Sequence, residues 1–123
     1  MLLVPTYVAA SGLHGLGVFA SAPIAKGAVI WRFVAGFDQV IPEETAKTWP
    51  PAAWDFLMKY SYVSPHIPGG FVLDGDHSRF LNHSKDANTD NATAVTIARR
   101  DIAKDEEITV DYDQIAVGWE LLA

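Results

Sequence analysis

Short runs of apolar, β-branched and aromatic residues alternate with glycine- and proline-rich turns along most of the chain. This pattern predicts short strands over residues 7–9, 18–20, 28–33, 71–74, 93–99 and 107–112. After Pro50-Pro51, the residues Ala53, Phe56, Leu57 and Tyr60 recur at the i, i+3, i+4 and i+7 spacing of one helix face. Residues 42–44 have the proline and acids of a first helical turn, and residues 114–122 fit either a short helix or a packed arm. The pattern therefore predicts a mostly β protein with one or two short helices.

The size and composition of the chain fit a single domain, which we place over residues 1–123. Half of the residues are hydrophobic and 20% are charged, so the chain can bury a core. The longest uncharged stretch, Leu2 to Pro23, is interrupted by prolines, glycines and a histidine, and no basic residues precede it. It predicts neither a membrane span nor a secretory signal. The expectation is a soluble, cytoplasmic protein.

Charge and cysteine content narrow the classes of function. The formal net charge of -6 argues against nucleic acid as a ligand, because duplex binding draws on phosphate neutralisation. An acidic surface is better suited to a basic protein or peptide. Without cysteine, disulfides, thiol nucleophiles and thiolate zinc sites are excluded. The four histidines lack metal-ligand spacing and residues 86–97 lack the glycine and glutamate of a calcium loop, so we predict no metal site.

Three segments carry candidate chemistry. In Gly15-Leu16-Gly17, two glycines one residue apart allow a backbone to approach a ligand closely, although the third glycine of a dinucleotide loop is missing. In Arg79-Phe80-Leu81-Asn82-His83-Ser84, four polar side chains surround two apolar anchors. Residues 107–112 predict a strand that ends in Tyr112. Taken singly, these segments are a turn, a cap and an edge strand.

Taken together and in this order, the three segments resemble the signature of SET-domain protein-lysine methyltransferases. The resemblance covers roughly Ser11 to Asp113, and the length is close to that of minimal viral and bacterial members. It implies the SET-domain (β-clip) fold, with several small twisted sheets, one or two short helices and a knot-like threading near the C-terminus. It also implies S-adenosylmethionine as cofactor and methyl transfer to a lysine ε-amine of a protein.

The resemblance assigns roles to residues of this chain. The backbone of Gly15, Leu16 and Gly17 would line the methionine part of the cofactor, and Arg79 would pair with its carboxylate. Asn82 would bind the cofactor amino group, and His83 would lie against the adenine. Tyr112 would be the catalytic residue, with its hydroxyl at the meeting of cofactor and lysine. Such a reaction needs alignment and a neutral amine rather than an acid/base dyad or a metal.

The chain also departs from the family pattern. Many members carry a cysteine after Asn-His-Ser and close the site with a zinc-bound tail, whereas this chain has Lys85. Trp119 or a second subunit is the expected lid, which makes a homodimer an expectation. Tyr60 and Tyr62 are placed at the substrate channel, where packing of both rings in the core is an equal alternative. Gln114 stands where many members have phenylalanine or tyrosine, so the number of methyl groups added is not predicted.

Three hypotheses follow. The leading one is an enzyme that methylates a lysine-containing basic protein, such as a histone-like or ribosomal protein, and acts in the host nucleus if the chain is viral or secreted as an effector. The second is a SET-fold module without turnover that binds a basic peptide or serves as an assembly partner. The third is a small β domain with a chance match. Retention of Asn82, His83 and Tyr112 together favours the enzyme.

Overall fold

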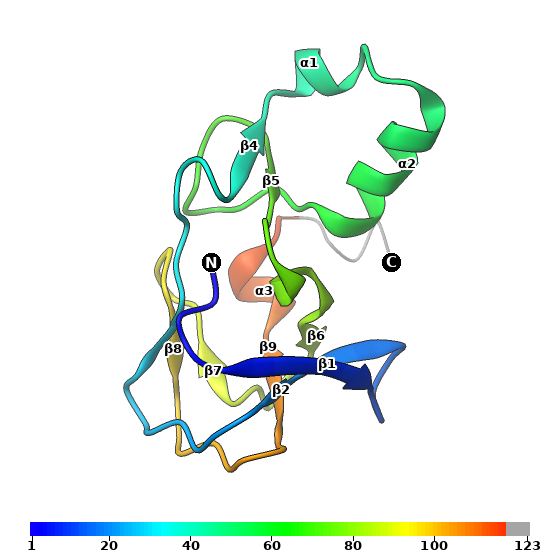
Figure 1. Ribbon diagram of the computed structural model, residues 1–123. Coiled ribbons are helices and arrows are strands. Elements are labelled where there is room, and N and C mark those ends of the chain that lie inside the picture. Colours follow the sequence, from blue (N-terminus) through cyan, green and yellow to red (C-terminus); the bar gives the residue numbers. More distant parts are fainter. Residues whose placement is uncertain (118–123) are drawn as a thin grey trace.

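The computed structural model describes residues 1–117 (Figure 1). Its elements in chain order are β1 (Thr6–Ala10), β2 (Leu16–Ala20), β3 (Val29–Trp31), β4 (Gln39–Ile41), α1 (Glu43–Ala46), α2 (Pro51–Tyr60), β5 (Phe71–Leu73), the 3₁₀ helix η1 (His77–Phe80), β6 (Asn82–His83), β7 (Thr89–Asp90), β8 (Thr96–Ala98), β9 (Glu107–Val110) and α3 (Tyr112–Ile115). The prediction of a mostly β protein with few short helices is confirmed. None of the helices in residues 1–117 is long and apolar enough to span a membrane.

The strands form three small sheets. Their orders are β1-β2-β9-β6, β3-β8-β7 and β4-β5. In the first sheet β9 is antiparallel to β2 and parallel to β6, with Asn82 opposite Thr109 and His83 opposite Val110. This sheet therefore brings together strands that belong to all three of the candidate segments, although these are far apart in sequence.

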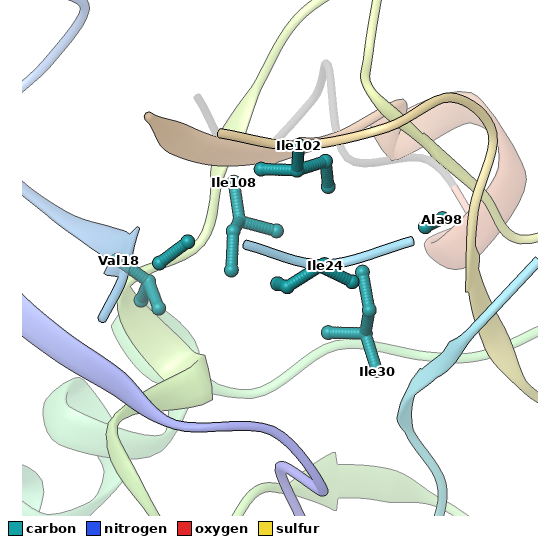
Figure 2. Close-up of a cluster of buried hydrophobic side chains, with 7 residues drawn as sticks. Val18, Ile24, Ile30, Ala98, Ile102 and Ile108 are labelled. Atoms are coloured by element: carbon teal, nitrogen blue, oxygen red, sulfur yellow. The ribbon is translucent and has the colours of Figure 1, made fainter. Parts of the chain in front are cut away.

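A core of branched aliphatic side chains holds the first two sheets together. Val18, Ala20, Ile24, Ile30, Ala98, Ile102 and Ile108 are all at most 4% exposed. Figure 2 shows how these side chains, from strands and from the loops between them, converge on one another. Burying side chains of this size contributes about 1.5–3 kcal/mol each for the larger ones. The core lies beneath β2 and β9 and so fixes the base on which the candidate segments rest.

A second, smaller cluster joins the helices to β4 and β5. Ile41, Ala46 and Leu57 are its buried members, and Figure 1 shows α1 and α2 together with β4 at one end of the molecule. Helix α2 starts at Pro51, because a proline in the first turn lacks only an N–H that would have no helical partner there. The predicted helical face is divided: Leu57 is buried in this cluster, whereas Phe56 is 42% exposed.

Asn88 takes the place of a strand residue beside β9. Its Oδ1 accepts from the Thr109 backbone N–H at 2.9 Å, and its Nδ2 donates to the Glu107 backbone carbonyl at 2.8 Å. Its own backbone N–H donates to Thr109 Oγ1 at 3.1 Å. The side chain is 2% exposed. It therefore satisfies main-chain groups of β9 that would otherwise be buried without partners.

Three sequence predictions need correction. The strand predicted over residues 28–33 is reduced to β3, Val29–Trp31, because only this part pairs with β8. The strand predicted from Thr93 to Arg99 is shorter in the structure, where β8 covers only Thr96–Ala98 because residues 92–95 form a bend. Tyr112 does not end a strand: β9 stops at Val110, and Asp111 caps α3 by accepting from the Asp113 N–H at 3.0 Å. Tyr112 is therefore the first residue of a helical turn.

Candidate functional site

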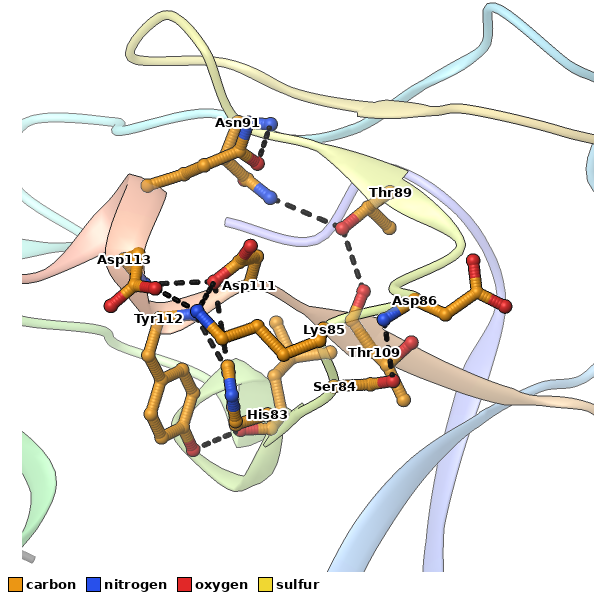
Figure 3. Close-up of polar contacts among 12 residues, drawn as sticks. His83, Ser84, Lys85, Asp86, Thr89, Asn91, Thr109, Asp111, Tyr112 and Asp113 are labelled. Carbon is orange, nitrogen blue, oxygen red and sulfur yellow. Dashed lines mark hydrogen bonds and ion pairs between the residues drawn. The ribbon is translucent and has the colours of Figure 1, made fainter.

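Tyr112 is fastened to the Asn-His segment at two points. Its backbone N–H donates to Nδ1 of His83 at 3.0 Å, and its hydroxyl donates to the Leu81 carbonyl at 2.7 Å. The two rings lie 5.1 Å apart at 40°, and Figure 3 shows them side by side. Since the neutral imidazole accepts at Nδ1, its proton is on Nε2. Burial raises the pKa of the Tyr112 hydroxyl, which is therefore neutral at physiological pH.

Charged side chains surround the start of α3 on the side away from the tyrosine ring. Lys85 forms ion pairs with Asp113 and, at 3.9 Å, with Asp111 (Figure 3). Asp111 also lies 3.9 Å from Nδ1 of His83. These groups are partly or largely solvent-exposed, so their pairs contribute little to stability. Lys85 is thus an ion-pair partner of two carboxylates at the start of α3.

Asn82 holds the bend between β1 and β2. The two hydrogens of its Nδ2 are shared among three acceptors, the carbonyls of His14 and Leu16, each at 3.0 Å, and Oε2 of Glu107 at 2.9 Å. The side chain is 6% exposed. The structure thus joins the predicted cofactor-binding segment Gly15-Leu16-Gly17 directly to the predicted cofactor-binding Asn82.

The two glycines of this bend are favoured for different physical reasons. Gly15 has a φ of 48°, in the left-handed region that favours glycine. At Gly17 a Cβ would lie 2.5 Å from Oε2 of Glu107, so a larger residue would displace this carboxylate from its present position. At Gly17 the close neighbour in this structure is a carboxylate of the same chain, and the approach of a ligand to this segment stays a prediction.

Arg79 lies across the exposed aromatic side of α2. Its guanidinium carbon is 5.3 Å from the ring centre of Phe56 and 5.8 Å from that of Tyr60, and Nη2 donates to the Asp74 carbonyl at 2.8 Å. Tyr60 in turn packs edge-on against Phe80, with ring centres 5.8 Å apart. A guanidinium has five N–H donors, so Arg79 retains the capacity to bind an anion.

A cavity of about 540 Å³ lies between the end of α2, residues 91–96 and α3. This volume is in the range of small-molecule sites. Four predicted site residues line it: Arg79, Tyr60, Tyr62 and Tyr112. Of the other predictions, Gly15, Leu16, Gly17, Asn82 and His83 are outside the lining formed by residues 1–117, although His14 of the same bend is part of it. Trp119 lies outside the described residues.

One wall of the cavity carries buried polar groups, and its residues Asp74 and Ser78 were not predicted as part of the site. Asp74, 6% exposed, accepts from Ser78 Oγ at 2.8 Å, and the Tyr62 hydroxyl lies 3.5 Å from its other oxygen. Burial raises the pKa of the Asp74 carboxyl to about 6, although the bond from Ser78 lowers it. Burial, followed by the charges of Asp74 and Asp38, also raises the pKa of Tyr62 far above its ordinary value. A polar residue directly after the buried strand β5 was the sequence signal that could have identified Asp74.

Trp31 and Asn91 complete this wall. Both line the cavity and are at most 5% exposed. Among the buried side-chain nitrogen and oxygen atoms of residues 1–117, Nε1 of Trp31 has no hydrogen-bond partner. Such a donor stabilises the fold poorly by itself and suits a site that receives an acceptor from a ligand or from water. A lone tryptophan in a predicted strand gave no sequence signal for this role.

Gln114 lies outside the cavity lining described for residues 1–117 and connects two of its walls. Its Oε1 accepts from the Asn91 N–H at 3.0 Å, and its Nε2 lies 3.4 Å from Oδ1 of Asp90. The next residues, Ile115, Ala116 and Val117, line the cavity. Gln114 therefore holds the 90–91 segment against α3 and does not fill the channel.

This chain is similar to one known protein family and to several solved structures. The family model described as "SET domain" matches residues 15–113. A Plasmodium falciparum protein with a provisional assignment as a histone methyltransferase is 24% identical, with a TM-score of 0.62 over 90% of this chain and 95% of that one. No sequence among the curated proteins matches significantly.

Chains of a Chaetomium thermophilum Polycomb Repressive Complex 2 have the same fold. The apo complex is 18% identical, with a TM-score of 0.70 over 96% of this chain. An autoinhibited form bound to S-adenosylmethionine is also 18% identical, with a TM-score of 0.66 over 97% of this chain. In both cases the match spans only 16% of the larger chain.

Proposed function

The chain belongs to the SET-domain family, and we propose that it transfers a methyl group from S-adenosylmethionine to the ε-amine of a lysine in a protein substrate. The observation that carries the proposal is the fixed tyrosine at the cavity wall. Tyr112 is held by His83 and by the Leu81 carbonyl, and Tyr60, Tyr62 and Arg79 line the same cavity. Support also comes from the S-adenosylmethionine in one of the similar structures.

The residues present fit such a cofactor. S-adenosylmethionine supplies an electrophilic methyl group on a sulfonium. Arg79 would bind its carboxylate with guanidinium donors that the Asp74 carbonyl leaves available. The bend at Gly15-Leu16-Gly17, held by Asn82, would contact the amino-acid part, and the His83 ring would pack against the adenine. Trp119 is proposed as a lid over the adenine.

Tyr112 would orient the lysine amine. Its hydroxyl donates to the Leu81 carbonyl, and a hydroxyl oxygen in this role can also accept a hydrogen bond from the amine. The raised pKa keeps this hydroxyl neutral, so it does not stabilise an ammonium as a phenolate would. A free lysine has a pKa of about 10.4, and deprotonating it at pH 7 costs about 5 kcal/mol. Tyr60, Tyr62 and the apolar Val110 in the lining would lower this cost by excluding water.

Two measurements test the proposal in sequence. Isothermal titration calorimetry of the wild type with S-adenosylmethionine should show binding, and Asn82→Ala should weaken it. Transfer of a labelled methyl group to basic proteins should then be detected, with the label on lysine. Absence of cofactor binding by the wild type would refute the proposal, and binding without transfer would favour a SET-fold module that binds peptides without turnover.

Tyr112→Phe separates the catalytic role from cofactor binding. The ring is retained, so cofactor affinity should change by less than about twofold, whereas loss of the orienting oxygen should lower kcat by about tenfold or more. Tyr7→Phe is the matched control, because Tyr7 is exposed, stacks on Phe19 at 5.5 Å and donates to Asp105 far from the cavity. Equal rates for Tyr112→Phe and the wild type would show that another tyrosine performs this role.

We also propose that the substrate is a basic protein and that the chain pairs with a second copy. The net charge of -6 supports the first point. The second is supported by Val63 and Val117 at the cavity mouth, which are 43% and 59% exposed and joined by a 2.8 Å backbone bond. A second subunit that covers these side chains is the alternative to Trp119 as a lid. Sedimentation should then give twice the monomer mass for the wild type and the monomer mass for Val63→Lys.

A further inference from the structure

The bend between β1 and β2 has little packing to define its shape. Leu13 and Leu16 are 58% and 48% exposed, and a Cβ built on Gly12 or Gly15 would meet no atom within 4 Å. One backbone bond, from the Ser11 N–H to the Gly15 carbonyl at 2.8 Å, closes the bend. Side-chain hydrogen bonds must therefore supply most of what selects this conformation over others.

Ser11 organises the amino-terminal half of the bend. Its Oγ accepts from the backbone N–H of Leu13 at 2.9 Å and of His14 at 3.3 Å. A hydroxyl can accept two such bonds only when its own proton points elsewhere. In this structure Ser11 Oγ donates to the Glu107 carboxylate, at 2.7 Å to Oε1 and 3.0 Å to Oε2. Glu107 thus orients the hydroxyl so that its lone pairs face the bend.

Glu107 also orients the amide that holds the carboxyl-terminal half of the bend. Its Oε2 accepts from Nδ2 of Asn82 at 2.9 Å, and the same nitrogen donates to the carbonyls of His14 and Leu16. Room for the carboxylate exists because residue 17 is glycine. One carboxylate on β9 therefore fixes both the N–H groups and the carbonyls of the bend, through two different side chains.

We propose that Glu107 and Ser11 are positioning residues that fix residues 12–16 in the conformation that binds the amino-acid part of S-adenosylmethionine. The inference rests on the proposed function, in which this bend contacts the cofactor. Neither residue touches the reacting atoms. Their effect is on the fraction of molecules whose bend is ready to bind, and the apparent dissociation constant rises in inverse proportion to that fraction.

Glu107→Gln is the sharpest test because it keeps the shape of the side chain. The carboxamide has one acceptor oxygen in place of two, so its NH₂ group must face either the Asn82 amide or the Ser11 hydroxyl. We expect the dissociation constant and the KM for S-adenosylmethionine to rise about tenfold, the order typical of losing a hydrogen bond to a charged group. At saturating cofactor kcat should change by less than about twofold, because Tyr112 is undisturbed.

Glu106→Gln is the matched control. It removes the same charge from the neighbouring residue, whose carboxylate contacts Asn88 Nδ2 and the Ala103 N–H and not the bend. Its KM for the cofactor should equal that of the wild type. An unchanged KM and dissociation constant in Glu107→Gln, with a wild type that binds the cofactor, would overturn the inference alone. A wild type that does not bind the cofactor would refute the proposed function, and the inference with it.

Ser11→Ala provides a second route if Glu107→Gln does not fold. It should also raise the KM for the cofactor with kcat preserved, and Ser11→Thr, which restores a hydroxyl, should recover most of the affinity. Since Ser11 is oriented by its bond to Glu107, the effects of Ser11→Ala and Glu107→Gln should be less than additive in the double variant. Ser11→Ala with wild-type affinity, or fully additive effects, would contradict the proposal.

Discussion

Asp74 is a buried carboxyl whose ionisation the fold disfavours, so replacing it with asparagine should change how stability depends on pH. Its side chain is 6% exposed, and burial raises its pKa from 3.8 to about 6, against the lowering effect of the bond from Ser78. Asparagine has nearly the same shape and can still accept that bond. The substitution therefore removes the ionisation and retains most of the packing.

The sign and the magnitude of this stability difference follow from the raised pKa of Asp74. Because the pKa is higher in the folded protein than in the unfolded chain, the folded state binds the proton more tightly. The contribution of this group to stability is therefore fully present below about pH 3.8 and is lost as the pH rises to about 6. A shift of about two units corresponds to about 3 kcal/mol. We expect Asp74→Asn to be more stable than the wild type by up to about 3 kcal/mol at pH 7.5 and by little at pH 4.

Urea unfolding followed by tryptophan fluorescence between pH 4 and pH 8 measures this difference. Asp55→Asn is the control, because it makes the same chemical change on the exposed side of α2. The free energy of unfolding of the control should follow the wild-type pH dependence. A constant difference between Asp74→Asn and the wild type across this range would refute the reasoning, since it would mean that Asp74 ionises equally easily in both states.

Two further substitutions test the packing of the fold. Asn88→Ala leaves the Thr109 N–H and the Glu107 carbonyl of β9 buried without partners. We therefore expect the free energy of unfolding to fall by about 3 kcal/mol and the melting temperature, measured by differential scanning calorimetry, to fall by about 10 °C. A fall of less than about 1 kcal/mol would contradict this role. Gly70→Ala places a Cβ 2.2 Å from a backbone oxygen at a φ of 147° and should lower the free energy of unfolding by more than about 3 kcal/mol. Its control is Gly36→Ala, at a φ of 88° with open space around it, which should cost only about 1–2 kcal/mol in the same assay. Equal losses would show that backbone strain alone matters at both positions.

Periodicity predicted the kinds of elements well and their roles less well. The spacing of Phe56, Leu57 and Tyr60 identified α2, because a helix face recurs every three to four residues whatever lies against it. It could not show that Leu57 packs on β4 and β5 while the rings of Phe56 and Tyr60 contact the Arg79 guanidinium. Which side of a helix meets which neighbour depends on the partner surface, and that surface belongs to other parts of the chain.

The candidate site divides in a similar way. The motif around Asn82, His83 and Tyr112 was identified from sequence, and the structure brings these residues together through the β6–β9 pair. Their cofactor-binding roles stay predictions. Asp74 and Trp31, which line the same cavity, belong to no part of the motif. The place of Asp74 directly after β5 was its one sequence signal, and Trp31 had none, since the burial of a polar group depends on parts of the chain far away in sequence.

The sequence by itself determined the family, the mostly β architecture and the residues expected to do the chemistry. These depend on residue type and short spacing, which each segment carries locally. Only the tertiary structure decided which side chains hold the Gly15-Leu16-Gly17 segment. The bonds from Ser11 and Asn82 to Glu107 join residues 96 and 25 positions apart, and the space above Gly17 is set by the antiparallel register of β2 and β9. Contacts of this length depend on the packing of whole sheets, which no local pattern specifies.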